Sequence, residues 1–382
     1  MSSALRDADW LTPARVRAYA VIVMLASLGV VVAAFFQATG TVGSDFLAFW
    51  GAGKAVLSGD PAAAYDLAVQ ERIQTSTGSE GWFAFVNPPP YLFAITPFAL
   101  LPYPAAWAAW VALTYALFAW AGIQAFPRLW LLVLAYPGAL IAATHAQNGL
   151  LTGALLIGAV VALARRRDWA GGVTIGALVI KPHLALIVPV WLAAGGRWRA
   201  FVGAGLAALG FVLLSWLAFG STTLEGYTQS WQASAVLMEA RNPDLFLRMS
   251  TLYAQLRLWL NSDLSLAIAL ALATLMALVA ALGWRRSGGD TMASGALALA
   301  ATGLAVPYLF NYDLPFLLLP TLWLVRRGLD DGFRPYEKLL LVGLYFAPYA
   351  TRAAAFPLGI NLMPVAALLL VWMVWTRTSR SA

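Results

Sequence analysis

The stretch YAVIVMLASLGVVVAAFF, residues 19–36, is an apolar run without a charged side chain. At about 1.5 Å of rise per residue, a helix of this length crosses most of the roughly 30 Å hydrocarbon core of a bilayer. Arg15 and Arg17 precede the run, and no small-residue cleavage site follows it. The stretch therefore predicts a first transmembrane helix and not a cleavable signal peptide.

Comparable runs fill the rest of the chain. The sequence is 61% hydrophobic and 11% charged, against about 25% charged residues in an ordinary soluble domain. We therefore expect an all-α, polytopic membrane protein that forms one domain, residues 1–382, with about 12 transmembrane helices. Further spans are predicted at 104–125, 128–144, 149–164, 200–219, 264–284 and 292–310, with shorter ones near 314–325, 337–350 and 362–376.

Two apolar segments do not fit a simple span. Residues 88–101 are too short to cross and are interpreted as a dipping or interfacial helix. Residues 170–194 are broken by Lys181-Pro182 and are interpreted as two short helices that form a hairpin. A helix that breaks at membrane depth must be covered by protein or line a wet cavity.

The loop charges predict the orientation. With an inner N-terminus and 12 crossings, 17 of the 24 Lys and Arg residues fall on the inner side, which predicts cytoplasmic termini. This bias also explains the net charge of +7 better than nucleic-acid binding does. The seven outer basic residues are Lys54, Arg72, Lys181, Arg241, Arg248, Arg257 and Arg352.

Composition and motifs exclude several classes of protein. The chain has no cysteine, so it has no disulfide and no thiolate metal site, and its two histidines, His145 and His183, leave little for a metal cluster. No G-x-x-x-x-G-K-[ST] motif is present, which argues against an ATP-driven pump. Two long outer loops, 37–87 and 220–262, carry Trp and Tyr and are expected to be helical caps at the membrane interface.

Five polar motifs are candidates for chemistry, because polar residues in or near a membrane bundle are costly. Asp45 begins an amphipathic helix after the first span, where it or Ser44 is either an N-cap or, for Asp45, a general base. Asn87 precedes three prolines, which form a rigid start to the next helix, and its side chain could contact a polar ligand. His145, Gln147 and Asn148 form either a tight polar turn or a recessed set of ligand positions.

The other two motifs lie further along the chain. Lys181 stands within an apolar stretch, so its amine either reaches the outer interface by snorkelling or holds a phosphate, with His183 beside it. Tyr312 and Asp313 lie between two spans, in either a capped turn or a site. The predicted topology puts all five motifs on the outer face. Together they offer the carboxylate, cation, amides and aromatic rings that a sugar phosphate would need.

Short motifs also follow one another in a characteristic order between about residues 43 and 320. They are Asp45-Phe46-Leu47-Ala48-Phe49-Trp50, Leu57-Ser58-Gly59-Asp60-Pro61, Ala64-Tyr65-Asp66, Asn87-Pro88-Pro89-Pro90, Pro97, Leu101-Pro102, Trp107, Gln147-Asn148-Gly149, Thr152, Ala170-Gly171-Gly172, Lys181-Pro182, Pro189, Arg197-Trp198-Arg199, Pro307-Tyr308 and Tyr312-Asp313. In this set and order the chain resembles glycosyltransferase family 87 of the GT-C superfamily, which includes polyprenyl-phosphate-mannose-dependent mannosyltransferases.

The resemblance implies a GT-C-like bundle that transfers a sugar, with inversion, from a polyprenyl-phosphate donor to a lipid or glycan acceptor. It implies a bacterial inner membrane, a periplasmic site, and no metal or other cofactor. It makes Asp45 the base and Lys181 the holder of the donor phosphate, with a second polar site at His145 and Gln147. Mannosyltransferase members often carry Trp and His where this chain has Asn311-Tyr312-Asp313, which leaves the sugar open.

Two other functions are alternatives to the transferase. A transporter or flippase for a lipid-linked substrate would place polar residues on both faces, whereas the candidates here share one face. A non-catalytic assembly factor with the same fold would have lost Asp45 or Lys181, and both are present. The sequence names neither the sugar, the acceptor nor the oligomeric state.

Overall fold

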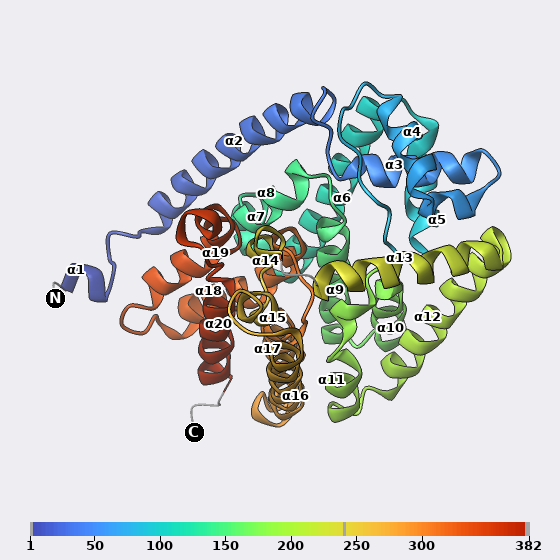
Figure 1. The fold of residues 1–382 in the computed structure, drawn as a ribbon. Helices are drawn as coiled ribbons and strands as arrows, with labels where there is room; N and C mark the ends of the chain where they lie inside the picture. The colour runs from blue at the N-terminus through green and yellow to red at the C-terminus, as the bar shows by residue number, and fades with distance from the viewer. Residues whose placement is uncertain (1–2, 240–241, 379–382) are drawn as a thin grey trace.

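The computed structural model describes residues 3–239 and 242–378, and the regular elements of these residues are helices (Figure 1). The prediction of an all-α chain is confirmed. Arg241 and Arg380, which the predicted topology put on opposite sides, lie outside the described residues.

Five of the described helices are long and apolar enough to cross a membrane. Four of them correspond to the predicted runs 19–36, 104–125, 200–219 and 264–284, and the fifth extends the predicted 337–350 segment to residue 358. The five are α2 (Pro13–Ala38), α6 (Tyr103–Ala125), α12 (Trp198–Phe219), α16 (Ser262–Arg286) and α19 (Glu337–Leu358).

A sixth span is bent. Instead of one helix over 128–144, the chain forms η3 (Pro127–Leu129), α7 (Trp130–Leu134) and α8 (Pro137–Thr144), with a bend of 48° at the break. Pro137 has no backbone N–H, and it disfavours helical geometry at the residue before it. The predicted span 128–144 is therefore present as a bent pair of short helices and not as one straight helix.

The predicted number of about 12 transmembrane helices is not confirmed. Helix α9 (Gly149–Ala164) has the predicted bounds, but its 16 residues reach only about 24 Å. Helix α17 stops at Ala305 and not at 310, because Pro307 follows closely. The other short elements of this half are α17 (Thr291–Ala305), η6 (Asn311–Leu317), α18 (Leu318–Asp331) and α20 (Met363–Arg377).

The segment broken at Lys181-Pro182 folds back on itself. Its elements are α10 (Asp168–Gly176), η4 (Ala177–Ile180), η5 (Pro182–Ala185) and α11 (Val188–Ala194). Arg197 Nη1 lies 3.1 Å from Asp168 Oδ1, so the two ends of the segment meet and Lys181 stands at its tip. Helix α10 packs closely on α12, since a Cβ at Gly172 would come within 2.5 Å of the carbonyl oxygen of Ala200.

Both long loops are helical, and they touch each other. The first contains α3 (Phe46–Leu57), η1 (Pro61–Tyr65) and α4 (Leu67–Thr75), and α5 (Tyr91–Ile95) and η2 (Thr96–Leu100) follow it. The second contains α13 (Ser221–Glu239), α14 (Pro243–Arg248) and α15 (Leu252–Leu256). The rings of Tyr65 and Tyr227 lie 6.0 Å apart between the loops. Helix α3 is anchored by Phe46 and Phe49, whose buried rings pack on Trp110 of α6.

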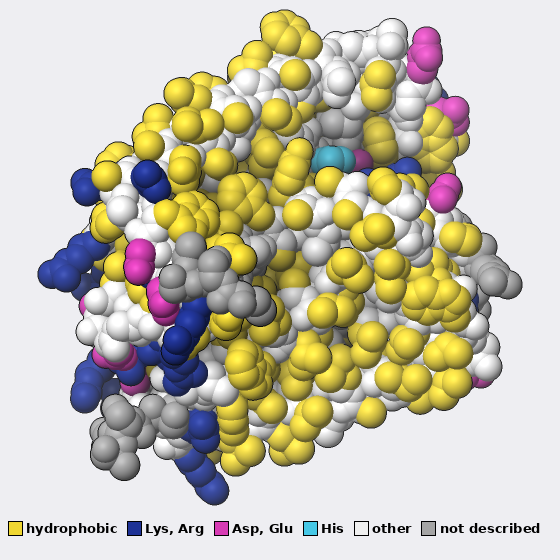
Figure 2. Space-filling view, turned by 90° about the vertical axis from the view of Figure 1, so that its left-hand side faces the viewer, with side chains coloured by type: hydrophobic (Ala, Val, Ile, Leu, Met, Phe, Trp, Pro, Cys, Tyr) yellow, Lys and Arg dark blue, Asp and Glu magenta, His cyan; other side chains and the backbone are white. Residues whose placement is uncertain are grey.

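The surface is divided by polarity. Figure 2 shows a broad hydrophobic face with Lys and Arg gathered along one edge, and a recess in which a histidine lies beside charged side chains. The start of α19 ties the described ends of the chain together, because Lys338 pairs with Asp9 at 3.2 Å and Glu337 pairs with Arg377. Both ends, including α1 (Ser3–Arg6), therefore lie on one side of the molecule (Figure 1).

Candidate functional site

Asp45 stands at the N-cap position of α3, but its side chain does not cap the helix. The half-buried carboxylate instead accepts a hydrogen bond from Gln147 Nε2 at 2.9 Å, in the turn after α8. Ser44, the alternative cap, has its hydroxyl 3.1 Å from that of Tyr103 and accepts from the indole of Trp107. The carboxylate of Asp45 is therefore directed across the helices and not along its own.

Lys181 is buried at the tip of the folded-back segment, with 8% of its surface exposed. Its ammonium forms an ion pair with Asp313 Oδ1 and donates to Asn148 Oδ1 at 2.8 Å. Asp313 is fully buried, and its other oxygen accepts from the backbone N–H of Phe310 at 3.0 Å. The amine is thus held inside the bundle and does not snorkel. An ammonium has three donors, and these two bonds leave one for a further partner.

The dipeptide Gln147-Asn148 joins these two centres. Gln147 binds the carboxylate of Asp45, and the next side chain binds the ammonium of Lys181. Gly149 follows at the start of α9, where a Cβ would overlap the carbonyl oxygen of Tyr312. This close contact fixes α9 against η6 and so holds the carboxylate and the ammonium in one arrangement.

Aromatic rings surround the ion pair. The rings of Tyr312 and His145 lie 6.3 Å apart, and Lys181 Nζ lies 5.3 Å from the Tyr312 ring centre. Phe310 stacks on Tyr312 at 5.1 Å, and His183 meets Tyr308 edge to face at 5.7 Å. Rings of this kind offer faces for the C–H groups of a sugar as well as polar edges.

Three buried polar atoms at this cluster have no hydrogen-bond partner among the described residues: Tyr91 Oη, Asn148 Nδ2 and His183 Nε2. The Tyr91 hydroxyl and the Asn148 side chain lie close enough to interact, although not with the geometry of a hydrogen bond, and His183 lies beside the charge of Lys181. Leaving a buried polar group unpaired costs roughly 1–3 kcal/mol. The atoms therefore mark a place where a polar ligand would find partners. Tyr91 was not among the residues predicted for the site, although it directly follows the three prolines.

Asn87 does not join the cluster that the other candidate residues form. Its backbone carbonyl accepts a hydrogen bond of 2.7 Å from the hydroxyl of Tyr65, which anchors the loop before α5. Burial, and then the neighbouring Tyr227, raise the pKa of Tyr65 well above its ordinary value, so this hydroxyl remains a donor. The geometry supports the structural alternative for Asn87 and shows no side-chain contact with the cluster.

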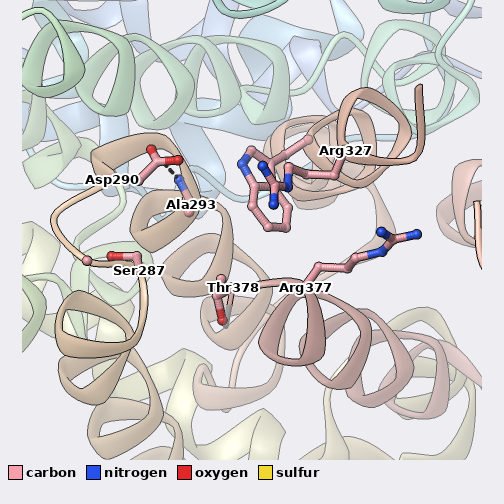
Figure 3. Close-up of a pocket in the computed structure, with 8 residues that line it drawn as sticks. Ser287, Asp290, Ala293, Arg327, Arg377 and Thr378 are labelled. Carbon is pink, nitrogen blue, oxygen red and sulfur yellow. Dashed lines mark hydrogen bonds between the residues drawn. The ribbon is translucent and has the colours of Figure 1, made fainter. Parts of the chain in front are cut away.

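Two cavities lie elsewhere. An apolar cavity of about 350 Å³ lies between α2, α6 and the bent pair α7–α8, and it extends to Ala143, two residues before His145. A polar pocket of about 230 Å³ lies between the ends of α16, α17, α18 and α20, where Asp290 and Arg327 line it and the Arg377 guanidinium points away (Figure 3). The predicted site residues line neither cavity. Within 3–239 and 242–378, no three His, Asp or Glu side chains are placed to hold a metal ion.

Comparison with known proteins gives one match. A family model described as Glycosyltransferase family 87 matches residues 85–307. The match includes the turn at 145–148 and the tip at Lys181, whereas Asp45, Tyr312 and Asp313 lie outside it. No curated protein and no solved structure matches the chain.

Proposed function

Because this chain belongs to glycosyltransferase family 87, whose model matches more than half of it, we propose that it is a membrane transferase acting on lipid-linked sugars. In this proposal it moves a sugar from a polyprenyl-phosphate donor to a hydroxyl of a lipid or glycan acceptor. The helices that are long and apolar enough to span a membrane fit a donor of that kind.

The observation that carries the proposal is the bridge through Gln147-Asn148. A carboxylate with a single hydrogen bond within the described structure and an ammonium with a spare donor are bound by the side chains of two adjacent residues. Transfer from a phosphate-linked sugar needs both groups: one to accept the acceptor's proton and one to stabilise the leaving phosphate.

Asp45 is the proposed base. The acceptor hydroxyl gives its proton to the Asp45 carboxylate, and its oxygen attacks the anomeric carbon as the bond from that carbon to the phosphate oxygen breaks. A direct displacement of this kind inverts the anomeric configuration. Asp313 is the less suitable base, because it is fully buried and already paired with Lys181.

Lys181 is the proposed partner of the leaving polyprenyl phosphate. Its third N–H, together with Asn148 Nδ2, Tyr91 Oη and His183 Nε2, would give the phosphate oxygens four partners that are now unpaired or spare. Asp313 pairs with the lysine and orients its ammonium while the donor is absent. Hydrogen bonds to a developing negative charge in a dry site are among the strongest contributions to catalysis.

The donor tail is proposed to lie in the apolar cavity between α2, α6 and the bent pair. The cavity is lined almost wholly by hydrophobic side chains and ends near the turn that carries His145. A lipid chain there would leave its phosphate at the level of the cluster. A lipid tail within the bundle would explain why the polar cluster lies among short helices and not at the protein surface.

The remaining expectations are kept as proposals. They are a bacterial inner membrane, cytoplasmic termini, a periplasmic site, about 12 crossings with the short apolar helices included, no metal or other cofactor, and no nucleic-acid partner. The gathering of both described chain ends on one side of the molecule supports termini on the same side of the membrane.

The test uses the purified protein in nanodiscs with a membrane lipid extract as acceptor. Polyprenyl-phosphate mannose, glucose and arabinose, each radiolabelled, are supplied separately to wild type and to Asp45→Asn. We expect transfer by wild type and a loss of about 10²–10⁴-fold in Asp45→Asn, the range for removal of a general base.

Glu71→Gln is the matched control, because Glu71 is an exposed carboxylate of the same loop. It should retain full activity. Near-full turnover by folded Asp45→Asn would remove Asp45 from the mechanism. Failure of wild type to bind any of the donors would favour the transporter alternative.

A further inference from the structure

The polar pocket between the ends of α16, α17, α18 and α20 is separate from the cluster around Lys181. It lies at the start of α17, whereas the segment 307–313 follows the end of that helix, about 22 Å further along. Its volume is about 230 Å³, and Asp290 and Arg327 line it (Figure 3). A water molecule takes about 30 Å³ of the liquid. The pocket therefore has room for a group larger than a single water.

Asp290 uses only one of its two carboxylate oxygens within the described structure. It is the N-cap of α17, where Oδ1 accepts hydrogen bonds from the backbone N–H of Met292 at 2.9 Å and of Ala293 at 3.1 Å. The ion pairs of the described residues do not include Asp290. Oδ2 is therefore left to accept a hydrogen bond from a group in the pocket.

Arg327 lines the same pocket from α18. Figure 3 shows its side chain extending toward the start of α17. The guanidinium lies 6.0 Å from the ring centre of the buried Trp323, and its Nη2 pairs with Asp331 at 2.8 Å. Its Nε is buried and has no hydrogen-bond partner in the part of the chain that the structure describes. The guanidinium and the Asp290 carboxylate thus line one pocket without pairing with each other, and a ligand with one charge of each sign would give both a partner.

We infer that this pocket binds the phosphoethanolamine headgroup of a membrane phospholipid. The phosphate oxygens accept from the Arg327 guanidinium, whose planar fork matches them. The ammonium of the headgroup donates to Asp290 Oδ2. A phosphatidylcholine headgroup has no N–H to donate, and phosphatidylglycerol has no positive charge. This inference does not depend on the proposed transferase function.

The surroundings of the pocket favour a lipid over a soluble ligand. Helices α16 and α20 both end at the pocket, and Arg286 Nε joins their ends by donating to Trp375 O at 3.0 Å. In the turns before these ends, the side chains of Leu282, Leu368 and Trp372 are exposed. Acyl chains would lie against such apolar side chains while the headgroup occupies the pocket.

The common placement of arginines on the inner side of membrane proteins is the simpler explanation of the charge here. It accounts for exposed arginines such as Arg326, which pairs with Asp330 on the surface of α18. It does not account for a pocket in which an acidic and a basic side chain are left apart. Basic pockets between helix ends on that side of a membrane are known to take lipid headgroups.

The test measures lipid binding to the full chain in detergent by native mass spectrometry. The dioctanoyl forms of phosphatidylethanolamine, phosphatidylglycerol and phosphatidylcholine are titrated separately. We expect wild type to bind phosphatidylethanolamine about 10-fold more tightly than either other lipid, the value of one charge-assisted hydrogen bond. Equal affinities for the three lipids would overturn the assignment.

Two variants separate the two contacts. Asp290→Asn keeps the cap, since Asn and Asp are equally good N-caps, and it should lower the affinity for phosphatidylethanolamine about 10-fold without weakening phosphatidylglycerol. Arg327→Gln should weaken the binding of both lipids by a similar factor, because both carry the phosphate. Arg326→Gln removes the same charge one residue away and is the control, which should match wild type. Unchanged binding of phosphatidylethanolamine in either Asp290→Asn or Arg327→Gln would overturn the site.

Glycerophosphoethanolamine, which has the headgroup without acyl chains, separates a lipid from a soluble ligand. Its affinity for wild type should be at least about 10-fold lower than that of dioctanoyl phosphatidylethanolamine, because the acyl chains add buried apolar surface. Equal affinity for the two compounds would overturn the lipid assignment and leave a site for a soluble zwitterion.

Discussion

Two buried ion pairs, Lys181–Asp313 and Arg377–Glu337, differ in how completely they are bonded. Arg377 holds Glu337 through Nε at 2.8 Å and through Nη2, and it also donates to Gly332 O. Glu337 further accepts from the backbone of Arg334. The Lys181–Asp313 pair, in contrast, has a spare ammonium donor and orphaned polar atoms around it. A complete pair fastens the chain ends, whereas an incomplete one leaves room for a ligand.

The largest expected effect comes from breaking each pair in turn. Lys181→Met and Arg377→Met each leave a buried carboxylate without its partner, which should lower the free energy of unfolding by about 3–5 kcal/mol. Only Lys181→Met should also abolish transfer per folded molecule. Denaturant titration in mixed micelles gives the stability, and turnover is normalised to the folded fraction.

The double variant Lys181→Met/Asp313→Asn sharpens this test. Removing both charges should recover most of the lost stability and none of the turnover. If Arg377→Met lost as much turnover per folded molecule as Lys181→Met, the two pairs would not differ in function.

The next effect concerns the contact that fixes the site. Gly149→Ala would drive a methyl group into the Tyr312 carbonyl oxygen and separate α9 from η6. We expect a loss of about 1–3 kcal/mol or more, typical of overpacking, together with loss of donor binding. Gly158→Ala in the same helix has open space around its Cβ and should stabilise the protein by about 0.5–1 kcal/mol. Thermal melts measure the stability of both variants. Equal melting temperatures for Gly149→Ala and Gly158→Ala would contradict the close packing of α9 on η6.

A smaller effect is expected from removing the hydrogen bond between Gln147 and Asp45. Gln147→Ala removes the single hydrogen bond that orients Asp45, so kcat should fall about 10-fold, the value of a charge-assisted bond. The donor KM should hold, because Lys181 and Asn148 are untouched. A change in donor KM with unchanged kcat would show that Gln147 binds substrate and does not position the base.

The smallest expected effect comes from removing single tyrosine hydroxyls, one without a hydrogen-bond partner and one with a partner. Tyr91→Phe removes a buried hydroxyl without a partner within the described structure, so the ligand-free protein should be as stable or up to about 1 kcal/mol more stable. Its donor KM should rise a few-fold. Tyr345→Phe removes a hydroxyl bonded to Leu132 O at 2.8 Å and should cost about 1 kcal/mol with no change in KM. Thermal melts measure both variants, and the melting temperature should stay level or rise for Tyr91→Phe and fall for Tyr345→Phe.

Much of the fold followed from local sequence. Helix α9 begins at Gly149, after Gln147-Asn148, and ends before the run of charges at Arg165 as predicted, because its apolar run has clear limits. The break at Lys181-Pro182 was equally readable, since proline ends a helix and a lysine does not belong in lipid. The bend before Pro137 was missed because hydrophobicity alone joined the two short helices into one span.

Contacts between distant residues were less predictable. The sequence indicated that Lys181 needed a partner, but the acid it meets lies 132 residues away. Likewise, Gln147 reaches Asp45 across 102 residues. Asp45, Gln147, Asn148, Lys181 and Asp313 come together in one cluster and Asn87 does not. Their pairing depends on which helices adjoin, which the sequence does not state, and their place on the outer face stays a prediction. Tyr91 was not predicted as a site residue, because a short apolar helix with one tyrosine resembles ordinary core sequence.

The most direct test is an experimental structure of the protein with polyprenyl phosphate bound. The account predicts phosphate oxygens within hydrogen-bond distance of Lys181 Nζ, Asn148 Nδ2 and Tyr91 Oη, with the lipid chain in the apolar cavity between α2 and α6. A phosphate bound instead in the pocket near Arg327 and Arg377, with the atoms around Lys181 still unpaired, would contradict it.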